Sequence, residues 1–64
     1  MEKIEYYTPT EVTKITSLSH MTIARLVKEG NFPEPIQLTE KRKGFPKHEV
    51  DQWTIKQFIK SREG

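Results

Sequence analysis

The stretch "SHMTIARLVKEG" repeats apolar residues at helical spacing, which predicts an amphipathic helix over about residues 20–29. Ser19 is a favourable cap for its first turn, and Gly30 favours its end. Its polar side chains fall on the other side of the helix, where we expect them to meet solvent. The face expected to pack on a core holds Ile23, Leu26 and Val27.

An earlier helix is predicted over about residues 9–15. Thr8 can cap this helix, Pro9 suits its first turn, and Glu11 completes a T-x-x-E capping box. Its apolar face holds Val12 and Ile15.

The polar stretch from Thr16 to Ser19 separates these two helices. Its hydroxyl side chains compete for backbone hydrogen bonds, so it predicts a tight turn with Leu18 tucked inward. Two short helices joined by a turn of this length make a helix-turn-helix candidate.

The segment "NFPEPIQLTEKRKGFPK" predicts a β-hairpin rather than a helix. Its closely spaced prolines favour extended backbone. Ile36 and Leu38 alternate with Gln37, which is a strand pattern, and Phe45 lies on the returning strand. We expect the loop of this hairpin to carry Lys41, Arg42 and Lys43.

A third helix is predicted over about residues 47–61, with acidic residues near its start and basic residues near its end, as the helix dipole favours. Ile55 and Ile59 point away from its core face and have no obvious partner within the domain. The residues expected to close the core are Val50, Trp53 and Phe58.

These elements together predict a mainly α fold with a small β-hairpin, that is, a winged helix-turn-helix with three helices and a wing between the second and third. We expect residues 1–64 to form a single domain with a core over about residues 6–60. A chain of this length buries only ~60 % of its unfolded surface, so its stability should be modest.

The net charge of +2 is unevenly distributed. Residues 19–47 carry six basic and three acidic side chains, a balance of +3, whereas residues 1–18 sum to −1 and residues 48–64 to zero. The run "KRKGFPK" holds four cations without an acidic residue between them. Cations gathered on one small domain suggest a polyanionic partner.

Other classes of protein fit this composition poorly. The chain has no cysteine, no glycine-rich phosphate loop and no histidine pair at metal-ligand spacing. We also expect a domain this small to lack a pocket of ~300 Å³. We therefore expect no enzyme activity, cofactor, metal or small-molecule ligand. The absence of cysteine, of a signal peptide and of any long apolar run favours a cytoplasmic protein without a membrane segment.

Binding to double-stranded DNA is the function that the pattern favours. The second helix has the width to enter a major groove, and Arg25 is the residue type best suited to guanine. An exposed Met21 could touch a thymine methyl group. The hairpin loop, the wing, would add Lys41, Arg42 and Lys43 against the flanking backbone. The residues expected on the DNA-facing side of the helix are Ser19, His20, Met21, Thr22, Arg25 and Lys28.

A protein-interaction module is the alternative from another class. In that case Arg25 and Lys28 only solubilise a helix, with Arg25 paired to Glu29, and the lysines of the loop only protect a strand edge. The apolar pair Ile55 and Ile59 would then be a contact patch, which on a DNA-binding protein would suit a second copy or another protein.

The order of residues resembles the AlpA-like phage regulatory proteins, which group with excisionases in the MerR-type winged-helix superfamily. The likeness covers about residues 6–60. It rests on a helix opening Ser-x-x-Thr-Ile, a Lys-Glu-Gly-x-Phe-Pro-x-Pro turn, a Gly-aromatic pair and a Glu-Val-Asp-x-Trp motif. The matching residues are Ser19, Thr22, Ile23, Lys28, Glu29, Gly30, Phe32, Pro33, Pro35, Gly44, Phe45, Glu49, Val50, Asp51 and Trp53.

The resemblance implies a small sequence-specific DNA-binding regulator of a prophage or integrated element, or an excisionase that bends attachment-site DNA and steers an integrase. It places Lys41 where the family usually has a wing arginine. The residues that it places on the recognition helix are Ser19, His20, Met21, Thr22 and Arg25. Two departures stand out: His20 replaces a frequent arginine, and Glu34 occupies a position that is commonly basic. The target sequence, the integrase partner and the oligomeric state on DNA do not follow from the sequence.

Overall fold

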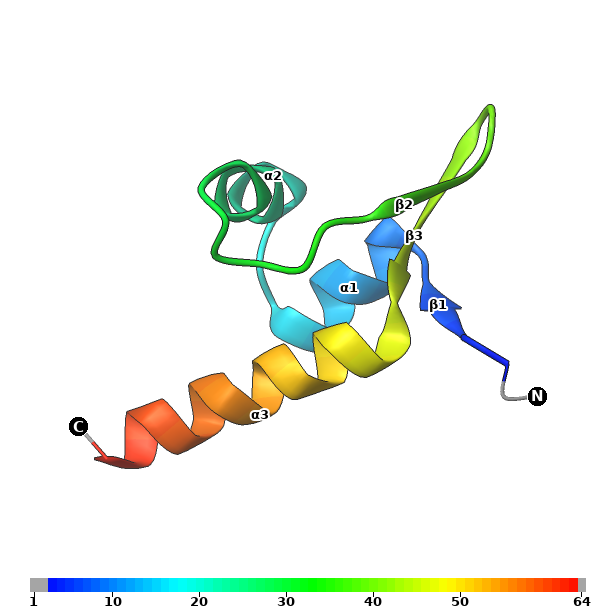
Figure 1. Cartoon of the computed structure of the whole chain (residues 1–64). Helices are drawn as coiled ribbons and strands as arrows, with labels where there is room; N and C mark the ends of the chain where they lie inside the picture. Colours follow the sequence, from blue (N-terminus) through cyan, green and yellow to red (C-terminus); the bar gives the residue numbers. More distant parts are fainter. Residues whose placement is uncertain (1–2, 64) are drawn as a thin grey trace.

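A computed structural model describes residues 3–63 of the chain. The predicted winged helix-turn-helix is confirmed: three helices surround a small core, and a β-hairpin extends between the second and third helices (Figure 1). The long third helix runs beneath the other elements, and its C-terminal end lies far from the hairpin (Figure 1). In chain order the elements are β1 (Tyr6–Tyr7), α1 (Pro9–Thr16), α2 (His20–Lys28), β2 (Ile36–Thr39), β3 (Arg42–Pro46) and α3 (Lys47–Glu63).

The first two helices begin at the predicted caps. The Thr8 hydroxyl accepts a hydrogen bond from the Glu11 amide, and the Glu11 carboxylate accepts one from the Thr8 amide, which completes the capping box. Between the helices Ser17 adopts a left-handed backbone conformation, with φ of 62°. That residue ends α1 and turns the chain within two residues toward Ser19, the cap of α2.

The hairpin differs from its predicted form in one respect. Its turn consists of Glu40 and Lys41, and β3 already begins at Arg42, so only Lys41 of the three expected loop cations lies in the turn. Arg42 pairs with Thr39 and Lys43 with Gln37. The strands therefore extend further toward the turn than the polar composition of this segment suggested. Pairing of β3 with β2 satisfies backbone hydrogen bonds, which do not depend on the type of side chain.

A third strand, β1, was not predicted. Tyr6 and Tyr7 pair with Pro46 and Phe45, so the sheet has the antiparallel order β1-β3-β2. Gly44 lies where the strands pack closely, since a Cβ there would stand 2.7 Å from Leu38 Cδ1 and 2.9 Å from Tyr6 Cβ.

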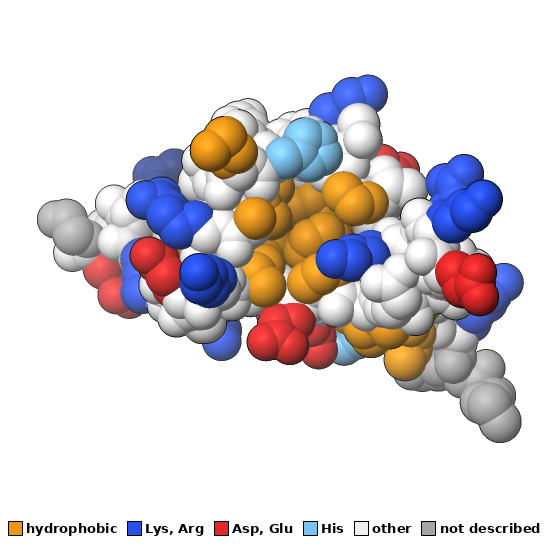
Figure 2. Space-filling view, turned by 90° about the horizontal axis from the view of Figure 1, so that it is seen from above, with side chains coloured by type: hydrophobic (Ala, Val, Ile, Leu, Met, Phe, Trp, Pro, Cys, Tyr) orange, Lys and Arg blue, Asp and Glu red, His pale blue; other side chains and the backbone are white. Residues whose placement is uncertain are grey.

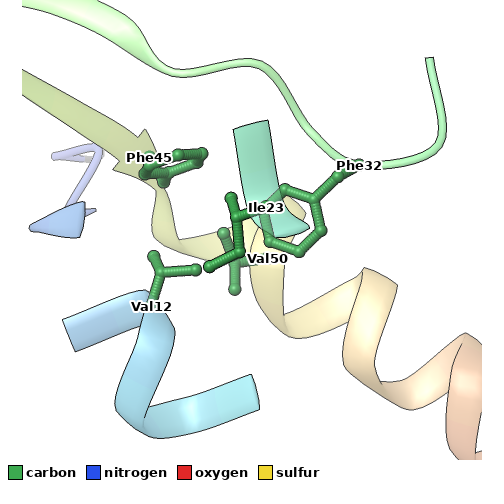
Figure 3. Packing of buried hydrophobic residues seen from close by; sticks show 5 residues of the cluster. All are labelled: Val12, Ile23, Phe32, Phe45 and Val50. Atoms are coloured by element: carbon green, nitrogen blue, oxygen red, sulfur yellow. The ribbon is translucent and has the colours of Figure 1, made fainter. Parts of the chain in front are cut away.

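One cluster of apolar side chains joins all three helices to the sheet (Figure 3). The Phe32 ring meets the Phe45 and Trp53 rings edge-on, with centroids 5.7 and 4.7 Å apart. The indole N–H of Trp53 donates a 2.7 Å hydrogen bond to the Asn31 carbonyl, which ties the loop after α2 to α3. The buried members of the cluster are Val12, Ile23, Phe32, Phe45 and Val50.

Phe58, which was expected to close the core, lies outside it, and Ile15 on the apolar face of α1 is exposed as well. Phe58 is 58 % exposed and Ile15 is 45 % exposed. On α3 the core cluster includes Val50, and Trp53 packs against it, but Phe58 does not belong to it. The inward position of Leu18 and the packing of Leu26, Val27 and Trp53 against the core are confirmed, although these side chains remain partly exposed.

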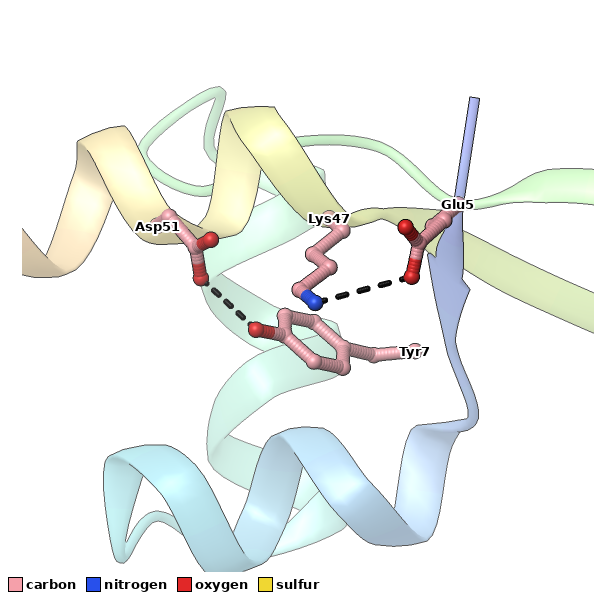
Figure 4. Close-up of polar contacts among 4 residues, drawn as sticks. All are labelled: Glu5, Tyr7, Lys47 and Asp51. Atoms are coloured by element: carbon pink, nitrogen blue, oxygen red, sulfur yellow. Dashed lines mark hydrogen bonds and ion pairs between the residues drawn. The ribbon is translucent and has the colours of Figure 1, made fainter. Parts of the chain in front are cut away.

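Polar contacts fix the start of α3 against β1 (Figure 4). The Lys47 amide donates to the Glu5 carbonyl at 2.8 Å, and the Lys47 ammonium lies 3.6 Å from the Glu5 carboxylate. The Tyr7 hydroxyl donates a 2.8 Å hydrogen bond to Asp51 Oδ1. This bond and the negative charges nearby raise the pKa of Tyr7 above its ordinary value of 10.0.

Candidate nucleic-acid interface

The helix α2 has the two faces that its sequence predicts. Ile23 is only 5 % exposed and belongs to the core, and Leu26 and Val27 pack against it. Met21, on the other side, is 84 % exposed, so its side chain takes almost no part in the packing of the domain. The charged and polar residues exposed along this helix are His20, Arg25 and Lys28.

Two of the predicted contact residues are already bonded to each other. The Ser19 hydroxyl accepts the Thr22 amide at 3.1 Å and donates to the Thr22 hydroxyl at 3.0 Å. Ser19 thus serves as the cap of α2, and within residues 3–63 the Thr22 hydroxyl donates to no acceptor of its own.

The hairpin extends from the same side of the molecule as α2 (Figure 1). Lys41, Arg42 and Lys43 are all exposed. Lys43 also borders a hollow whose other wall is α2, so its side chain lies nearer the helix than the turn does.

The cations of α2 and of the hairpin form no ion pair with the part of the chain that the structure describes. Among residues 3–63, Lys47 pairs with Glu5 at 3.6 Å and His48 lies 3.9 Å from Glu49, but the cations of α2 and of the hairpin take part in neither contact. The alternative in which Arg25 pairs with Glu29 is therefore not realised within 4 Å. Their charges are available to an anionic partner.

An apolar hollow of about 280 Å³ lies between α2 and the hairpin. Figure 2 shows the corresponding face, where apolar side chains gather in a recess bordered by His and by Lys or Arg side chains. The sequence did not reveal this hollow, because its walls come from four separate segments. They are formed by Pro9, His20, Ile23, Ala24, Val27, Pro35, Lys43 and Phe45.

The helix α3 carries the predicted apolar pair on its exposed side. Ile55 is 57 % and Ile59 is 47 % exposed. Phe58 adds to this patch, and the Arg62 guanidinium stacks over its ring with 4.9 Å between the Arg62 Cζ and the ring centroid.

The expectation that this small chain has no pocket of ~300 Å³ is wrong. An open groove of about 710 Å³ runs between the loop after α2 and α3, along Trp53, Lys56 and Lys60. Within residues 3–63, no three His, Cys, Asp or Glu side chains are grouped so as to hold a metal ion. No helix in the same range combines the length and the apolar character that a membrane span requires.

Comparison with known proteins agrees with this geometry at the level of the family. Neither the curated proteins nor the solved structures gave a match. A family model, described as prophage CP4-57 regulatory protein (AlpA), matches residues 8–59. This range begins at the cap of α1, ends within α3, and includes both α2 and the hairpin. The chain thus belongs to the AlpA family of prophage regulatory proteins.

Proposed function

We propose that this protein binds double-stranded DNA in a sequence-specific manner and regulates transcription of a prophage or integrated element. The observation that carries the proposal is that the cations of α2 and of the hairpin, which form no ion pair within residues 3–63, are exposed on elements extending from the same side of the molecule. A cytoplasmic location and a single DNA-binding domain over residues 1–64 are part of the same proposal.

In the proposed complex α2 enters the major groove. Arg25 donates to O6 and N7 of a guanine, which is the commonest specific contact of this kind. Thr22 offers its hydroxyl proton to a base or phosphate acceptor. Met21, exposed beside them, contacts a thymine methyl group. Lys28, at the other end of the helix, lies near a phosphate.

The hairpin acts as the wing of the complex. Its turn residue Lys41 and the strand residues Arg42 and Lys43 neutralise phosphates beside the site that α2 reads. These contacts set the position of the protein on the duplex, while α2 supplies the sequence preference. No enzymatic step, cofactor, metal or small-molecule ligand is needed for this activity.

A direct excisionase role is the second candidate. The observation that favours it is the exposed patch of Ile55, Phe58 and Ile59 on α3, which suits contact with an integrase or with a second copy on adjacent sites. The two roles use the same DNA contacts and differ in what the bound protein does next.

The first test is a fluorescence-anisotropy titration of the full chain with labelled duplexes from its own genomic neighbourhood and with shuffled duplexes, at two salt concentrations. We expect tight binding to one native duplex, with an affinity that falls steeply as salt rises. Equal and weak binding to native and shuffled duplexes would contradict sequence-specific recognition and favour the protein-interaction module.

A genetic test separates regulator from excisionase. The gene is deleted from an otherwise intact element, and integrase is supplied from an independent promoter. A regulator predicts that excision persists under these conditions. Loss of excision despite the supplied integrase would support the direct excisionase role.

A further inference from the structure

The hollow between α2 and the hairpin combines an apolar interior with a rim that carries one Lys and one His side chain. Its interior includes Ile23 and Phe45, each 5 % exposed, with the half-buried Val27 and Pro35 beside them. The polar side chains that line it are those of His20 and Lys43, one from each wall, and both are exposed.

The apolar surface of this hollow is in contact with water in the free protein, and a bound partner would remove it from water. Apolar surface in an open hollow gains free energy when another molecule covers it. Lys43 makes no ion pair among the described residues, so none of their carboxylates compensates its charge. A matching occupant therefore has an apolar body and a negative charge at its edge.

A deoxyribose with its phosphate has this chemistry. When α2 occupies a major groove, backbone strands border that groove on either side of the helix. The hairpin extends from the same side of the protein as α2 (Figure 1), where one of these strands would lie within its reach. In B-form DNA the C2′ methylene of each sugar faces the major groove. This apolar edge would meet the interior of the hollow while the adjoining phosphate reaches the rim.

We propose that the hollow receives one deoxyribose–phosphate unit of the bound strand, with the C2′ edge against Ala24 and Val27 and the phosphate between His20 and Lys43. The inference rests on the proposed function and goes beyond it, because it makes the hollow a sensor of sugar identity. A 2′-hydroxyl at this position would be placed against apolar side chains without a hydrogen-bond partner.

The test uses the native duplex identified by the anisotropy titration. A series of duplexes carries one ribonucleotide at each successive position, and a second series carries one neutral methylphosphonate linkage. We expect a single ribonucleotide position, at the edge of the α2 footprint, to weaken binding about tenfold. The methylphosphonate next to it should weaken binding as well.

Two variants assign these effects to the hollow. Lys43→Met removes the charge but keeps the apolar stem, so the methylphosphonate should cost this variant much less than it costs the native chain. Ala24→Leu fills the hollow from an exposed position and should weaken binding to the unmodified duplex. Lys14→Met, on α1, is the matched control and should leave the methylphosphonate effect intact. Circular dichroism checks that each variant is folded.

Specific binding to the native duplex, with no ribonucleotide position changing affinity by more than about twofold, would overturn this inference and leave the proposed function standing. Failure to bind any native duplex specifically would overturn both. A third result is also decisive: Ala24→Leu could leave DNA affinity unchanged yet abolish binding of the apolar anion anilinonaphthalene sulfonate. The hollow would then be a small-anion site, and the sugar–phosphate assignment would be wrong.

Discussion

The Tyr7 hydroxyl donates a 2.8 Å hydrogen bond to the Asp51 carboxylate and thereby joins β1 to the first turns of α3, 44 positions later in the chain. The same bond raises the pKa of Tyr7, because ionising the phenol would remove the donor and place a second negative charge beside Asp51. A two-residue strand is therefore held at both its backbone and its side chain.

Tyr7→Phe should lower the free energy of unfolding at neutral pH, because Asp51 loses its donor. In the native chain the contribution of this bond is complete below pH 10.0, the ordinary pKa of tyrosine, and is lost as pH rises through the higher pKa of the folded state. The stability difference between the native chain and Tyr7→Phe should therefore shrink above pH 10. Urea unfolding between pH 8 and 11 measures it; a difference that stays constant over this range would contradict the assignment.

Val12→Ala and Phe58→Ala test where the core ends. Val12 is fully buried, so its truncation should cost about 2 kcal/mol. Phe58 is 58 % exposed, so its truncation should cost less than about 0.5 kcal/mol despite the larger side chain. For a chain of this length a total stability of roughly 3–10 kcal/mol is expected, so thermal unfolding by circular dichroism resolves the two. Equal losses would place Phe58 in the core after all.

Helix and cap signals are local, which is why the sequence predicted α1 and α2 within a residue or two. Thr8, Ser19 and their neighbours specify those helix ends whatever the rest of the chain does. The strand β1 gave no such signal, because two tyrosines form a strand only by pairing with Pro46 and Phe45 at the far end of the hairpin.

Helical periodicity predicts which face of a helix a side chain lies on, but it does not predict whether another element packs against that face. Phe58 falls within reach of the face of α3 that includes Val50, yet Val50 belongs to the buried cluster and Phe58 does not. The exposed side of α2 followed from its periodicity alone. The hollow beside it did not, since Pro9, Pro35 and Lys43 meet α2 only in the folded chain.

Arg25→Ala should relax the sequence preference of binding. Loss of a bidentate contact to guanine costs ~1–3 kcal/mol on the preferred duplex and little on a duplex already mismatched at that position. Lys14→Ala removes one charge from α1 and serves as the control, with an equal and small effect on both duplexes. Anisotropy titrations with the two duplexes measure the ratio; an Arg25→Ala variant with unchanged discrimination would remove α2 from base readout.

Replacing both Lys41 and Lys43 by alanine should act differently. These side chains are expected to neutralise phosphates, so binding should weaken by a similar factor on native and shuffled duplexes. The slope of log affinity against log salt should become shallower by about 1.8, which corresponds to two lost phosphate contacts. A salt slope equal to that of the native chain would show that the hairpin does not contact the backbone.

Ile55→Ser with Ile59→Ser tests the apolar patch of α3. Both side chains are about half exposed and lie beyond the core, so the double variant should fold normally and bind a single isolated site with native affinity. If the patch joins neighbouring copies, the double variant should lose cooperativity on a duplex with two adjacent sites. Its overall binding constant should then equal the product of the two single-site binding constants. Gln57→Ser, in the same part of α3 but on the groove side, should leave cooperativity unchanged. Cooperative binding that survives the double isoleucine replacement would exclude this patch as the contact between copies.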